Sequence, residues 1–208
     1  MDRTGWDLVT SEQELRAVVD APLQRVSDKV ADRLHALHCA FLAASPLWLL
    51  ATSASDGTCN VSPKGDPAGA VLVLDERTLA LPDRPGNRRV DGFEDLLGNP
   101  HVGLVFLVPG RGDTLRINGR ASLVKEAPFF DRLRVEGKRP SLAVVVDVEE
   151  VFFHCAKAFL RSQLWDPATW NPDAVPSRAQ IAKALDRPDA SLAELQAYYG
   201  PSYGKDLY

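Results

Sequence analysis

The sequence has no excess of basic residues. It carries 24 Lys and Arg against 28 Asp and Glu in 208 residues, a formal net charge of −4. A nucleic-acid-binding protein usually shows a basic excess gathered into a patch or stripe. We therefore expect no nucleic-acid partner, and any positive charge that serves a function must be local.

Long apolar runs are also missing. Residues Met1–Trp6 do not show the cationic start and apolar stretch of a signal peptide, and no later window is apolar for long enough to cross a bilayer. We expect no membrane partner and a cytoplasmic location.

Cysteines are few and widely spaced. Cys39, Cys59 and Cys155 are an odd number, which argues against a disulfide framework and for a reducing compartment. We expect each of them to serve in packing.

What the sequence does contain is a series of short strand-like runs joined by turns. There is no alternation of strands with helices, so an antiparallel barrel or sandwich is favoured over a parallel sheet. The expected strands are 47–53, 59–62, 70–74, 78–82, 101–108, 114–124 and 142–153.

Helices are expected on both sides of these strands. Ser11 and Glu14 have capping-box spacing, which predicts a helix over 12–19, and helical periodicity predicts a second one over 23–43. A third, internal helix is expected over 90–97, and Ser177 and Ser191 predict two short capped helices. We divide the chain into N-terminal helices packing on the barrel (1–45), a strand-rich region (46–166) and a helical appendage or dimer arm (167–208), all in one structural domain.

A group of arginines precedes the internal helix. Arg88 and Arg89 would lie in its first turn, where the helix dipole makes a cation unfavourable by about 0.3–1 kcal/mol. An anion bound there would reverse this effect, since backbone N–H groups and guanidinium groups would converge on one phosphate. A solvated arginine cluster after a Pro-Gly turn is the equally weighted alternative.

The strand over 114–121 alternates in polarity. Thr114, Arg116, Asn118 and Arg120 should share one face, and the apolar residues between them the other. An ordinary exposed strand would show the same alternation. The polar face of this strand could serve a function because other cations, Arg111 and Lys64, are expected on nearby loops.

Other combinations of reactive residues are weaker. His35, His38 and Cys39 have helical spacing, but a packed or solvated helix face explains them better than a metal site. His154 and Cys155 are adjacent at a strand end and should point apart. We expect no metal and assign no catalytic residue.

Several ordered motifs resemble one known family. They are the segments 62–66, 82–89, 99–106, 109–121, 154–162 and 164–165. Together they cover about residues 30–170 and are similar to the pyridoxamine 5′-phosphate oxidase-related FMN-binding family, in one of its bacterial branches.

This resemblance implies a mainly β fold, a six-stranded antiparallel split β-barrel with flanking helices, and a homodimer with FMN at the interface. In it, Asn87, Arg88 and Arg89 match the phosphate-binding element, with Asn87 also capping the helix. Thr114 and Arg116 match the strand along the flavin ring, and Ser62 and Lys64 a loop near the cofactor. The full set of implied cofactor-binding residues is Ser62, Lys64, Asp83, Asn87, Arg88, Arg89, Thr114, Arg116, Lys157, Arg161, Ser162 and Trp165.

The activity implied is that of an FMN-dependent oxidoreductase, which passes hydride or electrons to or from an unknown small substrate, with NAD(P)H as a candidate donor. Arg116 and Lys64 are the candidates to stabilise negative charge at the N1/O2 edge of the ring. The sequence lacks the Arg-Leu/His-x-Arg type of ending that grips pyridoxal phosphate, so vitamin B6 oxidation is not expected. A flavin carrier or sensor without catalysis, and a barrel holding deazaflavin or haem, are the alternatives.

Overall fold

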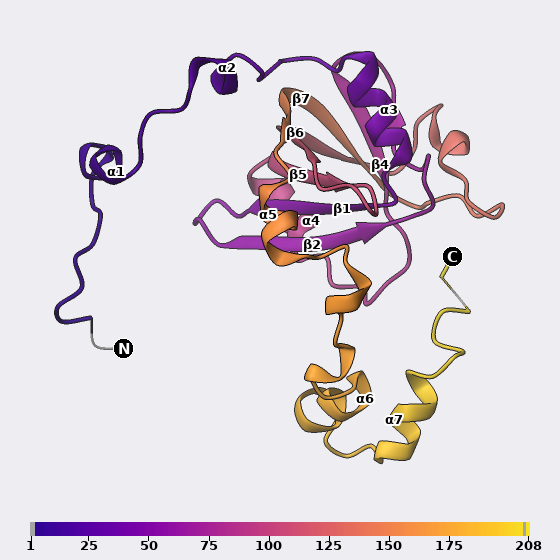
Figure 1. The fold of residues 1–208 in the computed structure, drawn as a ribbon. Helices are drawn as coiled ribbons and strands as arrows, with labels where there is room; N and C mark the ends of the chain where they lie inside the picture. The colour runs from indigo at the N-terminus through magenta and orange to yellow at the C-terminus, as the bar shows by residue number, and fades with distance from the viewer. Residues whose placement is uncertain (1–2, 206) are drawn as a thin grey trace.

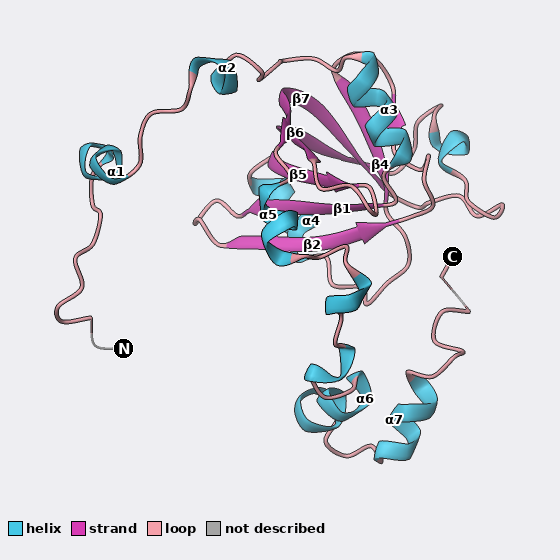
Figure 2. Ribbon diagram, in the orientation of Figure 1, coloured by secondary structure: helices cyan, strands magenta, loops and turns pink. Residues whose placement is uncertain are grey.

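The protein is built around one antiparallel sheet of seven strands, seen in a computed structural model that describes residues 3–205 and 207–208 (Figures 1 and 2). The order of the strands in the sheet is β2-β1-β5-β6-β7-β4-β3. Their bounds are β1 Leu47–Ser53, β2 Cys59–Gly65, β3 Leu72–Val73, β4 Thr78–Pro82, β5 His101–Leu107, β6 Thr114–Val124 and β7 Ala143–His154.

All seven predicted strand regions are confirmed, and β1, β4 and β6 have the predicted bounds. The mainly β class with flanking helices is confirmed as well. The count of six strands was wrong, because the short β3 adds a seventh at the edge of the sheet. No pairing among the described residues joins β2 to β3, so closure into a split barrel stays a prediction.

The core lies on one face of the sheet. Paired residues Trp48, Phe106 and Leu115 of β1, β5 and β6 are almost fully buried there. Helix α3 (Ala36–Ala44) and helix α4 (Asp91–Gly98) add apolar side chains to the same cluster, including Phe41 and Phe93. Removing this apolar surface from water is the main force that holds the sheet and the two helices together.

One glycine allows the two longest strands to pair closely. The register of β6 and β7 shifts between Asn118 and Gly119, which marks a β-bulge. A Cβ atom at Gly119 would overlap the backbone carbonyl oxygen of Asp147. Any side chain at this position would therefore force the strands apart.

The long second helix predicted for 23–43 was wrong. The chain forms a short α2 (Gln24–Ser27), leaves the helical path, and resumes as α3. Between them Ala31 makes a β-bridge to Val151, and the Leu34 N–H donates to the Glu76 carbonyl at 2.7 Å. These long-range backbone hydrogen bonds outweigh the local helical periodicity.

The N-terminal helix α1 spans Glu12–Val18, and its predicted cap is confirmed: Ser11 accepts a hydrogen bond from the Glu14 N–H. Neither α1 nor α2 buries a residue, whereas α3 buries Phe41 and Leu42 against the sheet. Figure 1 shows α1 and α2 reaching away from the sheet.

The C-terminal part forms an appendage below the sheet (Figure 1). It contains α6 (Arg178–Ile181) and α7 (Leu192–Tyr198), with a small core of Ala179, Ala182 and Leu195, and α5 (Lys157–Ser162) precedes it in the chain. The predicted capping boxes at Ser177 and Ser191 are confirmed. The division of the chain at residues 45 and 166 stays a prediction.

The three cysteines are all free, and two of them do not pack as predicted. Cys39 is half-buried against the core, but Cys59 and Cys155 are exposed. In the part of the chain that is described, no helix has the length and apolar character needed to cross a bilayer.

Candidate functional site

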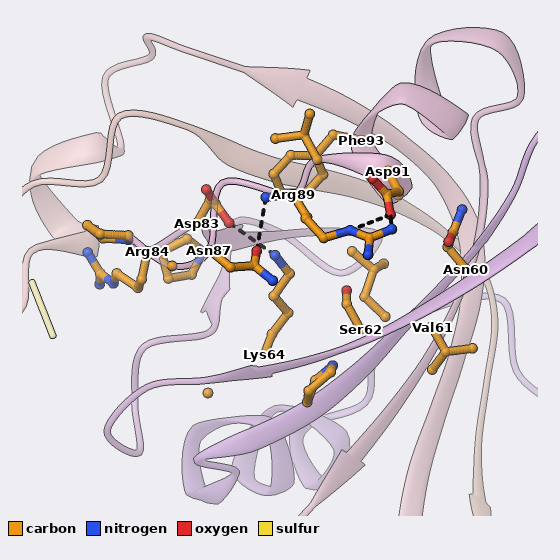
Figure 3. A pocket seen from close by; sticks show the side chains of 18 residues that line it. Asn60, Val61, Ser62, Lys64, Asp83, Arg84, Asn87, Arg89, Asp91 and Phe93 are labelled. Atoms are coloured by element: carbon orange, nitrogen blue, oxygen red, sulfur yellow. Dashed lines mark hydrogen bonds and ion pairs between the residues drawn. The ribbon is translucent and has the colours of Figure 1, made fainter. Parts of the chain in front are cut away.

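A pocket of about 670 Å³ opens between strand β2 and the segment from Pro82 to Phe93 (Figure 3). Pockets for small molecules and cofactors usually measure about 300–1,000 Å³. Five of the predicted cofactor-binding residues line this pocket: Ser62, Lys64, Asp83, Asn87 and Arg89. The structure therefore gathers residues from two distant parts of the sequence into one site.

The pocket has a polar wall and an apolar one. Alternation along β2 places Asn60, Ser62 and Lys64 on the same side of the strand. Phe93 of α4 contributes an aromatic surface, and the Lys64 ammonium lies 4.6 Å from the centre of its ring. Such an arrangement can hold a flat, partly apolar ligand that carries an anionic group.

Two of the pocket's cations are paired with carboxylates that an anion could replace. Lys64 Nζ lies 3.1 Å from Asp83 Oδ1, and Arg89 Nε lies 3.0 Å from Asp91 Oδ2 (Figure 3). The Arg89 side chain is 75% exposed, and ion pairs in water contribute little to stability. The carboxylate of Asp91 raises the pKa of the Arg89 guanidinium, which stays charged. Arg89 is thus free to turn toward a ligand at small cost.

The third cation, Arg84, is committed to the protein itself. Its Nε donates to Asp66 Oδ2 at 2.7 Å and its Nη2 to the Leu133 carbonyl oxygen at 2.7 Å. The side chain of Arg84 is 11% exposed and that of Asp66 is fully buried. Removing one partner of a buried ion pair is costly, so this pair fixes the segment rather than binding a ligand. The sequence had left Arg84 without a role.

The predicted cap of the internal helix was wrong. Helix α4 begins at Asp91, two residues beyond Arg89, and Val90 stands at its N-cap. The Asn87 side chain instead accepts a hydrogen bond from the Arg89 N–H at 2.9 Å, which closes a turn. The first helical turn holds Asp91 and Glu94, whose charge suits the helix dipole. The arginines therefore precede the helix, and Arg89 is paired with Asp91 of its first turn.

Arg88 adopts a backbone conformation that side chains disfavour. Its φ is +62°, in the left-handed region where residues other than glycine are strained. The side chain is exposed and has no hydrogen bond or ion pair within the described residues. It does not line the pocket, although both neighbours do.

A buried carboxylate supports the other end of the pocket. Asp95 of α4 accepts hydrogen bonds from Thr52 Oγ1 at 2.6 Å and from Asn60 Nδ2 at 2.9 Å. These contacts hold α4 against β1 and β2, where Asn60 lines the pocket. The sequence reasoning missed Asn60 and Asp95. The helical position of Asp95 between Phe93 and Leu96, both buried, was the available signal.

Thr114 and Arg116 lie elsewhere. Side chains alternate along β6, which puts four predicted residues on one face: Thr114, Arg116, Asn118 and Arg120. Of these four, Arg120 is the exposed one. Arg116 lies 4.4 Å from the Phe152 ring centre and 3.6 Å from Glu150. Burial, Arg116 and Lys29 together lower the pKa of the neighbouring His154, which favours its neutral form. None of these residues lines the pocket.

The four predicted residues near α5 form a separate group. Lys157, Arg161 and Ser162 are exposed on the short helix, and Ser162 Oγ donates to the Phe159 carbonyl oxygen at 3.2 Å. Trp165 stacks on Phe159 and donates through Nε1 to the Arg111 carbonyl oxygen at 2.7 Å. This group joins the appendage to the turn between β5 and β6, away from the pocket.

His35 and His38 are helix-capping residues. The ring of His35 accepts from the Leu37 N–H, and that of His38 from the His35 N–H, both at 3.1 Å. No group of three or more His, Cys, Asp or Glu side chains capable of holding a metal occurs among the described residues.

Comparison with known proteins identifies the family. The family model described as pyridoxamine 5′-phosphate oxidase matches residues 34–155, more than half of the chain. The chain belongs to this family. The matched region contains the whole sheet, together with every residue that lines the pocket. No curated protein matches the sequence.

Solved structures show weaker likenesses. HupZ of Group A Streptococcus is 18% identical, with a TM-score of 0.46, over 58% of this chain and 93% of that one. An FMN-binding protein of Syntrophomonas wolfei is 13% identical, with a TM-score of 0.43, over 55% and 81%. The haem storage protein HutZ of Vibrio cholerae is 14% identical, with a TM-score of 0.40, over 59% and 94%. The family assignment rests on the family model alone.

Proposed function

We propose that the pocket between β2 and the Pro82–Phe93 segment binds FMN and that the protein is an FMN-dependent oxidoreductase. The observation that carries this proposal is the convergence of Lys64, Asn87 and Arg89 on one pocket of cofactor size. These residues come from two segments, and each matches a position that the family resemblance gives to the cofactor.

The phosphate would be held at the segment before α4. Arg89 would exchange its exposed contact with Asp91 for the phosphate, and Arg88, next to the pocket, would turn its free guanidinium toward the same group. Guanidinium groups suit this task because two N–H groups can bind two phosphate oxygens at once.

The flavin ring would lie along the apolar part of the pocket. Leu50 and Phe93 line it, and Ser62 and Lys64 offer hydrogen-bond donors from the same strand wall. Bound FMN supplies hydride and electron transfer, and the chain's residues bind it, orient it and adjust its charge distribution. Lys64, which is partly shielded from water, would stabilise negative charge on the ring.

A homodimer is part of this proposal. The face of the sheet opposite the core carries exposed apolar side chains on β1 and β2, including Leu47, Leu49 and Val61. Arg116, Phe152 and Glu150 lie on that same face. A second copy packed there would cover these side chains and could bring its own Arg116 to the cofactor.

Purified protein tests this function directly. We expect a flavin absorption spectrum, FMN by mass analysis, and reduction by NAD(P)H with reoxidation by an acceptor faster than free FMN. Protein-bound FMN that turns over no faster than free FMN would support a carrier or sensor instead. A haem or deazaflavin spectrum would overturn the cofactor assignment.

A further inference from the structure

The last residue of the sequence, Tyr208, returns to the body beside the pocket. Its hydroxyl donates to Asp66 Oδ1 at 2.7 Å, and the Arg84 guanidinium lies 5.4 Å from the centre of its ring. In Figure 3 the faint yellow end of the chain lies next to Arg84, at one end of the pocket. Residues 66, 84 and 208, distant in the sequence, thus form one cluster.

This cluster joins four segments. Asp66 follows β2, Arg84 belongs to the pocket segment, and the Leu133 carbonyl oxygen that accepts from Arg84 ends the short helix Phe130–Leu133. Tyr208 belongs to the appendage, the fourth segment. Asp66 therefore uses one carboxylate oxygen for Arg84 and the other for Tyr208.

The appendage is held at two points. Trp165 attaches its start to the Arg111 carbonyl oxygen, and Tyr208 attaches its end to Asp66. Among the described residues, the hydrogen bonds and ion pairs that residues 166–205 make stay within residues 163–205. Both attachment points lie at the same end of the sheet, because Leu47 pairs with Gly65 on one side and Leu107 on the other.

We propose that Tyr208 is a positioning residue for the pocket: by docking on Asp66, it fixes the Asp66–Arg84 pair and with it the segment 83–89 that supplies the cations. A carboxylate with two partners is held in one orientation, and the guanidinium bound to it is held as well. Since Arg84 lies between Asp83 and the turn of Asn87, its fixation limits the positions open to both. The appendage is then a strap whose attachment tunes ligand affinity, an inference that rests on the proposed function.

Tyr208→Phe tests this proposal, because it keeps the ring over Arg84 and removes the hydroxyl. Tyr203→Phe is the matched control, since Tyr203 contacts Tyr198 and Tyr199 within the appendage. Amide hydrogen exchange on ligand-free protein should become faster at residues 83–89 in Tyr208→Phe, and remain unchanged in the strands β5 and β6. The FMN dissociation constant should rise about fivefold, the size of one hydrogen bond. Tyr203→Phe should change neither quantity.

The outcomes separate this proposal from the proposed function. Unchanged exchange at 83–89 in Tyr208→Phe overturns the positioning role even where FMN binds. Faster exchange with unchanged FMN affinity overturns the link to the pocket. If the unaltered protein binds no FMN, the proposed function fails, and the exchange measurement alone decides whether Tyr208 positions the segment.

Discussion

Lys64 and Arg116 lie on opposite faces of the same sheet. Across the sheet, Lys64 pairs with Trp48, Trp48 with Phe106, and Phe106 with Leu115, so these four side chains lie on one face. Arg116 follows Leu115 in β6, and its side chain therefore lies on the other face. The sequence-based prediction placed both side chains at the same edge of one flavin. This stays a prediction, and the experiment below tests whether the Lys64 and Arg116 of one site come from two chains.

Mixed dimers test this arrangement. In a heterodimer of Lys64→Ala and Arg116→Ala chains, sites built from two chains would leave one site intact and damage the other twice. We expect about half of the sites to bind FMN with unaltered affinity, while both homodimeric variants bind weakly. Isothermal titration calorimetry of heterodimers purified through two different tags measures the number and affinity of the FMN sites. Two equally weakened sites would contradict the arrangement.

Arg88 should lower the stability of the ligand-free protein while strengthening FMN binding. Since its φ is +62°, Arg88→Gly relieves backbone strain and should stabilise the ligand-free protein by about 0.5–1 kcal/mol. The same change removes a phosphate contact and should weaken FMN binding by about 1.5–3 kcal/mol. Arg88→Ala should show the weaker binding without the gain in stability. Chemical denaturation and FMN titration measure the two effects, and unchanged affinity in both variants would exclude Arg88 from the phosphate site.

The buried carboxylate of Asp95 should depend on Thr52. Thr52→Val keeps the shape of the side chain but removes the hydroxyl that donates to Asp95 at 2.6 Å. We expect a loss of about 1–3 kcal/mol in the free energy of unfolding, because a buried acceptor is left with one fewer partner. Thr58→Val, at an exposed position of the adjacent turn, is the control and should change stability little. Equal stability of the two variants in urea would show that the Thr52 contact is dispensable.

At alkaline pH, Tyr208 should lose its hydrogen bond to Asp66 and the end of the appendage should detach. The hydrogen bond to Asp66 raises the pKa of Tyr208 to about 12, with burial and the charge of Glu136 acting in the same direction and Arg84 against it. Because the folded state favours the neutral hydroxyl, this contribution is complete below pH 10, the ordinary pKa of tyrosine, and is lost as the pH rises to about 12. The difference in tyrosinate absorbance between the unaltered protein and Tyr208→Phe should show a midpoint near 12. A midpoint near 10 would mean that Tyr208 is not docked in solution.

The sequence predicted the strands well because their signals are local. Alternating polarity and turn residues defined β1, β4 and β6 to the residue. The helix expected over 23–43 failed because the backbone bonds of Ala31 to Val151, far along the chain, could not be read from periodicity. The start of α4 was misplaced because the arginines were read as helical, although Asp91 and Glu94 form the first turn.

Part of the candidate site was also predictable, because its residues lie in short motifs of the sequence. Family motifs pointed to Ser62, Lys64, Asp83, Asn87 and Arg89, which do line one pocket. The contacts that position them could not be found, because Asp66, Arg84 and Tyr208 meet only in the folded chain. Nor could a motif show that Arg116 and Lys64 occupy opposite faces of the sheet.

The central claim, that this pocket holds FMN through its cations, is tested most directly by FMN titration of Lys64→Gln and Arg89→Gln against the unaltered protein. Lys183→Gln, in the appendage, is the matched control, since its ammonium donates to the Pro188 carbonyl oxygen and does not line the pocket. We expect each pocket variant to weaken FMN binding by about 1.5–3 kcal/mol and the control to bind as the unaltered protein does. Equal affinity for FMN in all four proteins would contradict the assignment of the pocket.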